Sequence, residues 1–235
     1  MIKVEHLTKK FDDFTALDDL NLHVEKGAVY GLVGANGSGK TTLIKHLTGS
    51  LRPDIGSVVI NGQNADDNAE IRETLGFIPD ELYFFTNYSL KGMRDFYSKI
   101  YPRWDDERFN KMIKEFGLKE NARINRFSKG MQKQAAFILV MSTYPDVLIL
   151  DEPIDGLDPI MRKRVWGYLL GDVADRNMTV LISSHNLREL EGICDWVGIL
   201  QNGHLKFEGK LDDLKNEAKD MSLEDLFFFE LGGDM

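Results

Sequence analysis

Eight residues near the start of the chain have the composition and spacing of a phosphate-binding loop. Gly34 to Thr41 read Gly-Ala-Asn-Gly-Ser-Gly-Lys-Thr and match the pattern G-x-x-x-x-G-K-[ST]. The glycines let the backbone turn its N–H groups around an anion, and a helix beginning here adds its positive N-terminal end. Lys40 would reach the β- and γ-phosphates, and the Thr41 hydroxyl would bind Mg²⁺. The residues expected to contact ATP in this loop are Gly34, Ala35, Asn36, Gly37, Ser38, Gly39, Lys40, Thr41 and Thr42.

Two adjacent carboxylates follow an apolar segment later in the chain. Val147 to Leu150 are all aliphatic, and Asp151 and Glu152 come directly after them. Neighbouring residues at a strand end point in different directions, so the two acids can have different tasks. Asp151 suits Mg²⁺ coordination, directly or through water, and Glu152 suits polarising an attacking water. The alternative is a pair of acids that cap a turn, and the phosphate-binding loop upstream favours the hydrolytic interpretation.

One histidine stands at a similar strand end. His185 follows the apolar residues 180–182 and two serines. We expect its strand to lie beside the one that carries Asp151, because the carboxyl ends of parallel strands meet at one edge of a sheet. The His185 imidazole could then contact the γ-phosphate or the attacking water, although a lone histidine often has a structural role.

Apolar segments bounded by turn residues predict the strands that position these groups. Residues 2–7 and 20–33 read as strands, the second interrupted at Lys26-Gly27. The segment Ala28 to Val33 runs directly into the phosphate-binding loop, and a helix is expected after it. This is the strand–loop–helix context that the motif requires.

Further strands are expected in the rest of the chain. Gly56 to Ile60 is followed by an Asn-Gly turn, and Gly198 to Phe207 reads as a hairpin centred on Asn202-Gly203. Val147 to Leu150 and Val180 to Ile182 are short apolar runs of the kind buried in parallel sheets, and each precedes a helical pattern. The chemistry of the chain is therefore expected at the strand ends of a parallel sheet.

The segment between residues 88 and 144 has a helical pattern instead. Asp105 is placed to cap a helix whose apolar residues recur at i, i+3, i+4 and i+7. These apolar residues are Phe109, Met112, Ile113 and Phe116. We expect a helical subdomain over residues 87–145, an ATP-binding core with a β subdomain over 1–86 and 146–215, and an apolar C-terminal tail over 216–235. All are parts of a single domain spanning residues 1–235.

Composition narrows the functional classes. A formal net charge of −9 argues against a broad surface for nucleic acid, and no nucleic-acid partner is expected. The single cysteine, Cys194, cannot form an internal disulfide, which favours a reducing cytosol. The longest apolar runs, such as Ala135 to Met141, are far below the ~20 residues needed to cross a bilayer. If the protein works at a membrane, another chain is expected to supply the span.

With these residues assembled, the chain resembles the ATP-binding subunits of ABC transporters over nearly its whole length. Phe11 stands where that family has an aromatic that stacks on adenine, with Phe14 as a rival ring. The motifs that follow occur in the family's order, and they are the phosphate-binding loop, Pro79-Asp80-Glu81, Phe127-Ser128-Lys129-Gly130-Met131-Gln132, the carboxylate strand, Gly156-Leu157-Asp158 and His185. The resemblance implies an α/β fold: a P-loop NTPase core with a mostly parallel sheet, an N-terminal antiparallel β subdomain and an inserted helical subdomain.

The segment that starts at Phe127 resembles the family's signature motif. The Ser128 hydroxyl and the Gly130 amide would stand at a helix start and face a γ-phosphate, which in this family belongs to ATP held by the opposite subunit. The resemblance therefore implies a second nucleotide-binding subunit, in a homodimer or a heterodimer with approximate two-fold symmetry. Asp158 resembles the interface aspartate that links the two sites.

Two residues depart from the family pattern. Asp80 replaces the usual glutamine of the loop between the core and helical subdomains, which puts a shorter, charged group near Mg²⁺ and near the expected contact with a membrane partner. Lys129 replaces a signature glycine. Two roles are open for it: its side chain adds positive charge near the phosphate, or it is an ordinary solvated lysine. Lys40, Asp151, Glu152 and Ser128 all match.

The resemblance implies an ATPase that closes with a second subunit on ATP and drives separate transmembrane permease subunits, on the cytoplasmic face of the cell membrane. The short chain, the Asp80-Glu81 loop and the tail from Leu223 to Phe227 look most like the motors of bacterial exporters, including those that confer resistance to peptide antibiotics. The main alternative is a non-transport ABC ATPase of translation or DNA repair, but such relatives usually have a coiled-coil insertion or two cassettes. The interpretation of the chain as a kinase or GTPase does not explain the segment Ser128 to Gln132.

Overall fold

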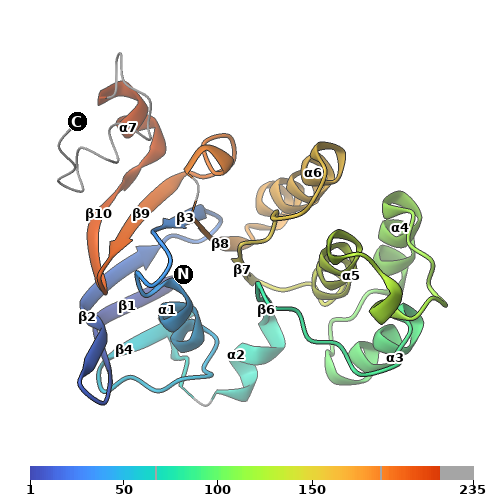
Figure 1. Ribbon diagram of the computed structural model, residues 1–235, viewed down its shortest axis with the longest axis horizontal. Helices are drawn as coiled ribbons and strands as arrows, with labels where there is room; N and C mark the ends of the chain where they lie inside the picture. The colour runs from blue at the N-terminus through green and yellow to red at the C-terminus, as the bar shows by residue number, and fades with distance from the viewer. Residues whose placement is uncertain (67, 186, 218–235) are drawn as a thin grey trace.

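Two β-sheets lie at one end of the molecule and a group of helices at the other (Figure 1). The computed structural model describes residues 1–66, 68–185 and 187–217. No helix within these ranges combines the length and apolar character needed to cross a membrane. The apolar segment 223–231 lies outside the described residues.

The larger sheet has six strands in the order β10-β9-β3-β8-β7-β6. The four pairings within β9-β3-β8-β7-β6 are parallel, and β10 pairs with β9 in the antiparallel direction. The carboxyl ends of the five parallel strands therefore meet at one edge of the sheet. The segments that carry the predicted site residues begin at this edge. The strands are β3 Val29–Val33, β6 Leu75–Ile78, β7 Val147–Asp151, β8 Thr179–Ser184, β9 Trp196–Gln201 and β10 His204–Lys210.

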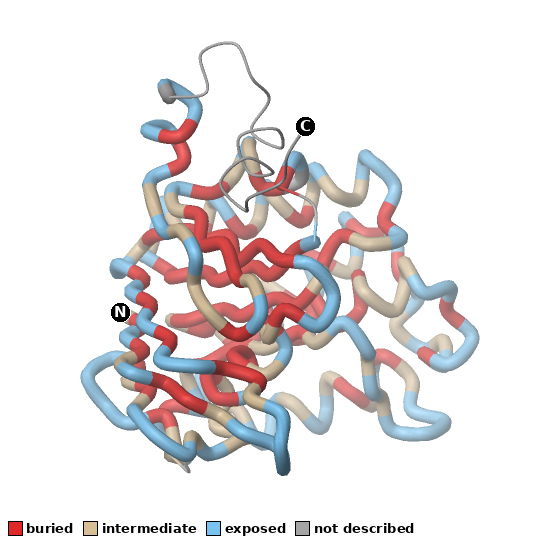
Figure 2. The backbone as a smooth tube through the Cα atoms, turned by 60° about the vertical axis from the view of Figure 1, so that its left-hand side comes forward, coloured by how far each residue is buried: buried red, intermediate tan, exposed pale blue. Residues whose placement is uncertain are grey.

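The central strands are apolar throughout because both faces of this sheet are covered. In β7, Val147 and Ile149 join a core that includes residues of α1 (Lys40–Leu47). Leu148 and Leu150 point to the other face and join the core that includes α5 (Lys129–Met141). Figure 2 shows the resulting band of buried strands. Successive side chains of these strands enter the two cores in turn, so both faces need apolar residues. This explains why the sequence shows uninterrupted apolar runs rather than alternating polar and apolar residues.

The smaller sheet is antiparallel, with strands in the order β2-β1-β4-β5. These strands are β1 Ile2–Phe11, β2 Phe14–Val24, β4 Ile55–Ile60 and β5 Gln63–Asn64. The expected strands at 2–7 and from residue 20 were too short: β1 and β2 continue to a tight turn, where Phe11 pairs with Phe14. Solvent-facing residues such as Lys10 broke the apolar signal, while Leu17 on the same hairpin is fully buried.

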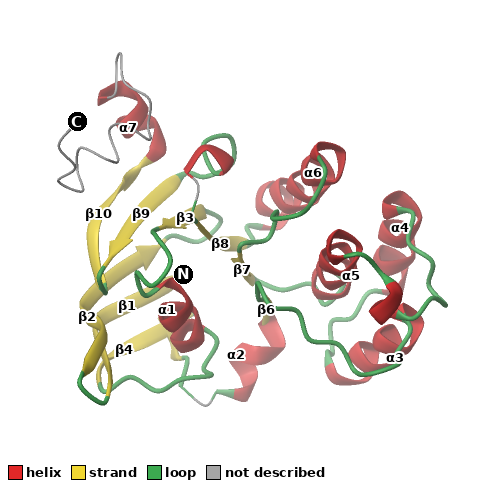
Figure 3. Cartoon of the chain, viewed as in Figure 1, coloured by secondary structure: helices red, strands yellow, loops and turns green. Residues whose placement is uncertain are grey.

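Helices cover the larger sheet and form the far end of the molecule (Figure 3). The expected cap is confirmed, because Asp105 accepts a hydrogen bond of 2.9 Å from the Arg108 amide at the start of α4. The helices other than α1 and α5 are α2 Ala69–Thr74, α3 Leu90–Ile100, α4 Asp106–Phe116, η1 Ile124–Arg126, α6 Pro159–Arg176, η2 Leu187–Glu189 and α7 Leu211–Glu217.

Paired charges attach α4 to the core. Both terminal nitrogens of Arg108 donate hydrogen bonds to the Asp172 carboxylate of α6, at 3.0 and 2.7 Å. The same carboxylate accepts a third hydrogen bond, of 2.7 Å, from Arg176. The two guanidinium groups lie 4.8 and 5.0 Å from the Tyr144 ring, in the segment that leads from α5 to β7. Because Asp172 is buried, these charges fix the helical end relative to the sheet.

Candidate functional site

The phosphate-binding loop connects β3 to α1, as the motif requires. Gly37 and Gly39 have φ values of 81° and 114°, in the region that only glycine adopts without strain. Gly34 is needed for a different reason: a Cβ at this position would lie 2.6 Å from Ser38 Oγ and collide with the Leu200 carbonyl oxygen. The glycines thus serve both the turn and the close packing of the loop against the sheet.

Lys40 is folded onto the loop that precedes it. Its Nζ donates hydrogen bonds to the carbonyl oxygens of Gly34 and, at 3.3 Å, of Ala35. Lys40 is buried, and this burial lowers its pKa from the usual value, while the carboxylates of Glu152 and Asp151 oppose the shift. The two acceptors of this buried ammonium are neutral carbonyl oxygens, which the oxygens of an anionic ligand can replace.

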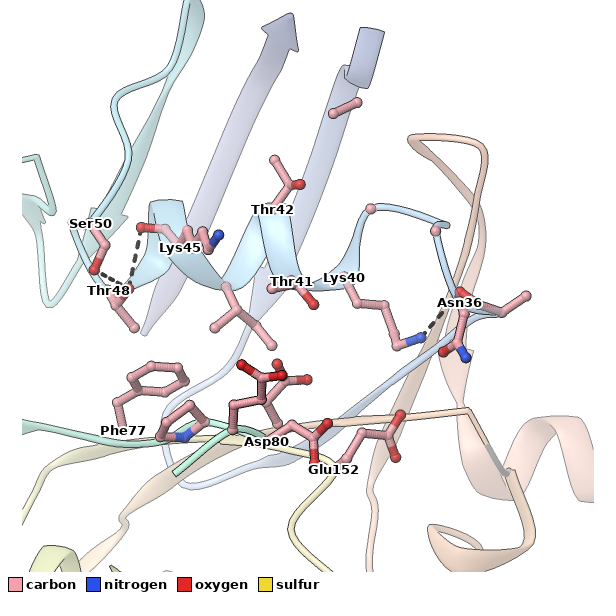
Figure 4. Close-up of a pocket in the computed structure, with 18 of the residues that line it drawn as sticks. Asn36, Lys40, Thr41, Thr42, Lys45, Thr48, Ser50, Phe77, Asp80 and Glu152 are labelled. Carbon is pink, nitrogen blue, oxygen red and sulfur yellow. Dashed lines mark hydrogen bonds between the residues drawn. The ribbon is translucent and has the colours of Figure 1, made fainter. Parts of the chain in front are cut away.

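A cavity of about 690 Å³ lies beside this lysine. In Figure 4, Asp80 and Glu152 stand across the cavity from α1 and its side chains. A volume of this size accommodates a nucleotide. The lining residues are Phe14, Ala16, Ala35, Asn36, Gly37, Gly39, Lys40, Thr41, Thr42, Ile44, Lys45, Thr48, Ser50, Phe77, Pro79, Asp80, Glu81, Asp151 and Glu152.

Asp151 and Glu152 enter the cavity from the end of β7. Asp151 is buried and accepts a hydrogen bond from the Ser183 hydroxyl on β8. The Glu152 amide donates to the Ser183 carbonyl oxygen at 3.2 Å, and Glu152 has a φ of 47°, in the left-handed region. The turn out of β7 therefore sends the two adjacent acids in different directions.

His185 lies next to Glu152, as the neighbouring strands predicted. β7 and β8 are parallel neighbours, and His185 Nδ1 lies 3.0 Å from Glu152 Oε2. Burial raises the pKa of Glu152, and the contact with His185 and the charge of Lys40 oppose that change. The histidine is half exposed and the glutamate side chain is 12% exposed, so the pair joins the cavity to the surface.

Asp80 is linked to this pair through a lysine that the sequence did not single out. Lys133 Nζ lies 3.3 Å from Asp80 Oδ1 and donates 2.7 Å to the main-chain oxygen of Glu152. Lys133 follows the signature segment on α5. No sequence spacing connects it to residues 80 and 152, and the contact becomes visible when the fold brings α5 beside the ends of β6 and β7.

Several predicted site residues do not line this cavity in the described part of the chain. Gly34 and Ser38 are buried within the loop. Phe14, the rival aromatic, lines the cavity, whereas Phe11 lies under the Lys9 ammonium, with 5.6 Å from Nζ to the ring centroid. The predicted residues outside the lining are Phe11, Gly34, Ser38, Ser128, Gly130, Asp158 and His185.

The signature segment forms a helix start on the surface. Ser128 is exposed and caps α5, because its hydroxyl oxygen accepts a hydrogen bond of 3.2 Å from the Met131 amide. The hydroxyl proton of Ser128 remains available to donate a further hydrogen bond. A Cβ on Gly130 would lie 2.9 Å from the Gly156 carbonyl oxygen, so the helix start packs closely on the loop after β7. Asp158 caps α6, accepting 3.0 Å from Ile160 and 3.1 Å from Met161.

Comparison with known proteins identifies the family. A family model described as "ABC transporter" matches residues 17–155, more than half of the chain. The chain belongs to the ABC transporter family. Its place there is that of an ATP-binding subunit, as the order of the motifs implied.

Curated relatives and a solved structure agree with this assignment. The ABC transporter ATP-binding protein YtrB of Bacillus subtilis is 31% identical over 217 residues, which cover 92% of this chain and 74% of YtrB. The bacitracin transport ATP-binding protein BcrA of Bacillus licheniformis is 35% identical over 222 residues, 93% of this chain and 72% of BcrA. A solved ATP-binding subunit of an ABC transporter superposes with a TM-score of 0.90 at 28% identity, covering 98% of this chain and 99% of that one.

These matches confirm the expected fold of this ABC transporter ATP-binding subunit: a P-loop NTPase core with a mostly parallel sheet, an antiparallel β sheet formed from the N-terminal region and an inserted group of helices. They favour the transporter class over the non-transport ABC ATPases, because the two curated relatives are transporter subunits.

Proposed function

We propose that this ABC transporter ATP-binding subunit binds and hydrolyses ATP and thereby drives a separate membrane-spanning partner. The observation that carries the proposal is one cavity in which Lys40, Asp151 and Glu152 face each other at the carboxyl edge of a parallel sheet. A cation for phosphate, a carboxylate for a metal and a second carboxylate for water are the parts that phosphoryl transfer to water needs.

The loop and its lysine hold the triphosphate in this proposal. The backbone N–H groups of residues 34–41 surround the phosphates at the positive end of α1, and Lys40 exchanges its carbonyl contacts for phosphate oxygens. The Thr41 hydroxyl and the Asp151 carboxylate are hard oxygen donors in the same cavity, which fits Mg²⁺, and Asp80 lines the cavity nearby. When bound, Mg²⁺ supplies positive charge that neutralises the phosphate oxygens.

Glu152 and His185 act on water. The carboxylate of Glu152 accepts a hydrogen bond from the water and polarises it, and burial favours this role because it keeps competing water away. His185, 3.0 Å from Glu152, is placed to steady the carboxylate and to contact the γ-phosphate side of the site.

The signature residues serve a second nucleotide-binding subunit. Ser128 and Gly130 stand at the start of α5, a helix of thirteen residues. Neither residue lines the cavity that contains Lys40 of the same chain. We infer that they contact the γ-phosphate of ATP held by the opposite subunit, and that Asp158 lies at that interface. Each ATP would then be held between two subunits, which open after hydrolysis and change the state of the permease.

Export is the proposed direction, with peptide antibiotics as a candidate class of cargo, because BcrA is a bacitracin transport protein. In this proposal the subunit works at the cytoplasmic face of the cell membrane through its permease. The test is purification with the product of the neighbouring gene. A polytopic membrane protein that raises ATP turnover and moves cargo in proteoliposomes supports the proposal, whereas a nucleic-acid factor as the partner contradicts it.

Replacing Phe11 by alanine should weaken ATP binding modestly. The resemblance assigns this ring to the adenine, and stacking contributes about 0.5–1.5 kcal/mol, while the phosphates supply most contacts. Titration of Phe11→Ala and Phe14→Ala with ATP, side by side, checks the assignment. A loss confined to Phe14→Ala would transfer the stacking role to Phe14, the ring that lines the cavity.

Replacing Asp80 by glutamine restores the family's neutral residue. ATP affinity should stay near normal, because Thr41 and Asp151 remain, while hydrolysis or its coupling to the permease should change, because Lys133 loses a carboxylate partner. Calorimetric ATP titration and steady-state turnover, with and without the permease, measure the two effects. A large loss of ATP affinity would instead make Asp80 a principal Mg²⁺ ligand.

A further inference from the structure

Lys133 connects three parts of the site that are distant in the sequence. Its side chain is 11% exposed on α5, the helix that begins with the signature segment. From there Nζ donates to the main-chain oxygen of Glu152 at 2.7 Å and lies 3.3 Å from the Asp80 carboxylate. A nearly buried ammonium needs such partners, because desolvation without them is costly.

The contact fixes the peptide unit that follows Glu152. On the other side of the residue, the Glu152 amide donates 3.2 Å to the Ser183 oxygen of β8. Glu152 thus has its N–H held by the sheet and its C=O held by Lys133, with a φ of 47° between them. A non-glycine residue stays in this left-handed region only when its surroundings hold it there. The direction of the Glu152 side chain follows from that backbone.

We propose that Lys133 is a positioning residue for Glu152, and that Asp80 holds Lys133 in place. The proposal rests on the proposed role of Glu152 as the residue that polarises water. It also assigns a role to the charged residue at position 80: its carboxylate is the counter-charge of Lys133, which ties the loop after β6 to α5 and to Glu152.

The first test replaces Lys133 by methionine, which keeps the unbranched side chain up to its last heavy atom and removes the charge and the donors. We expect kcat for ATP hydrolysis to fall about tenfold or more, since a small misplacement of a catalytic group has effects of this order. The KM for ATP should change less than about twofold, because Lys133 does not line the ATP cavity. Lys133→Arg, which keeps charge and donors, should recover part of kcat.

The control is Lys114→Met, at an exposed lysine in the last turn of α4, away from the cavity. It should leave kcat and KM at the wild-type values. Unfolding temperatures of all variants separate positioning from loss of structure, because a purely structural lysine would change stability and KM together and would not produce a selective loss of kcat.

The second test combines Lys133 with Asp80. Asp80→Asn alone should lower kcat by a smaller factor than Lys133→Met, and adding it to Lys133→Met should cause no further loss, because Asp80 acts through the lysine. Additive losses would overturn the link between the two residues. If Lys133→Met does not fold, Asp80→Asn alone decides: a lower kcat with an unchanged KM for ATP supports the proposal, and any other result overturns it.

Failure of this inference differs from failure of the proposed function. If wild-type protein hydrolyses ATP, Glu152→Gln does not, and Lys133→Met keeps the wild-type kcat, the positioning role is wrong while the site stands. If the wild type shows no turnover with its permease, the proposed function itself is wrong. If Glu152→Gln keeps wild-type turnover, the group that polarises water lies elsewhere, and the positioning role of Lys133 is overturned with it.

Discussion

Replacing Lys40 by alanine should abolish ATP hydrolysis and greatly weaken ATP binding. The ammonium is the buried cation of the cavity, and it faces the acids of Asp151 and Glu152. Without the ammonium, less positive charge would offset the repulsion between the triphosphate and those two acids. The binding free energy of ATP should therefore weaken by about 2–5 kcal/mol. Loss of the phosphate's position should lower kcat by at least about 10²-fold as well. Phosphate release and ATP titration of the purified protein measure both effects.

Lys26→Ala is the matched control for this experiment. Lys26 is an exposed lysine in the turn between β2 and β3, away from the cavity, and its removal takes away one positive charge without touching the phosphate-binding loop. It should bind and hydrolyse ATP as the wild type does. Wild-type turnover in Lys40→Ala would show that the cavity beside α1 is not the nucleotide site.

The strand ends could be predicted because local sequence and tertiary structure agree there. The apolar run 147–150 has no polar residue, since the sheet is covered on both faces, and Asp151 and His185 come where such runs stop. Parallel pairing then brings them to one edge whatever the rest of the fold. The glycine pattern of the loop was equally local, because positive φ at Gly37 and Gly39 is a property of each residue.

The hairpin of β1 and β2 could not be read in full. Solvent-facing residues occupy much of it, and pairing with β4 supplies stability that no single segment displays. Strand β6, Leu75–Ile78, was not predicted either, because four residues directly after a helix give too short a pattern. In both places tertiary pairing, rather than local sequence, determines the strand.

Contacts between distant side chains were beyond the sequence altogether. Lys133 reads as an ordinary polar residue of a helix, and its link to Asp80 and Glu152 depends on where α5 packs. The choice between Phe11 and Phe14 is of the same kind, since the two rings pair across one turn and differ in whether they face the cavity. Such residues are found once the fold is known.

Replacing Glu152 by glutamine should preserve ATP binding and stop turnover. The amide keeps the size of the side chain but cannot polarise water as a carboxylate does, and general bases contribute about 10²- to 10⁴-fold to rates. Lys40, Thr41 and Asp151 still hold the nucleotide. Glu107→Gln, at an exposed glutamate in the first turn of α4, is the control and should keep wild-type turnover.

Uncleaved ATP should then hold two subunits together, because each nucleotide is proposed to contact Lys40 of one and Ser128 of the other. A ligand that binds the dimer more tightly than the monomer shifts the equilibrium towards the dimer by mass action. Sedimentation with and without ATP should therefore show Glu152→Gln moving from monomer towards dimer, with the natural partner added if the pair is a heterodimer.

A second change at Ser128 tests where the phosphate lies. Because Ser128 also caps α5, alanine would confuse loss of the cap with loss of the phosphate contact. Asparagine and aspartate both keep the cap, and aspartate adds a negative charge. In the Glu152→Gln background, Ser128→Asp should therefore reduce the ATP-dependent dimer more than Ser128→Asn does. Equal dimerisation of the two variants would remove Ser128 from the phosphate site, and a Glu152→Gln protein that binds ATP yet stays monomeric with its partner would contradict the shared site.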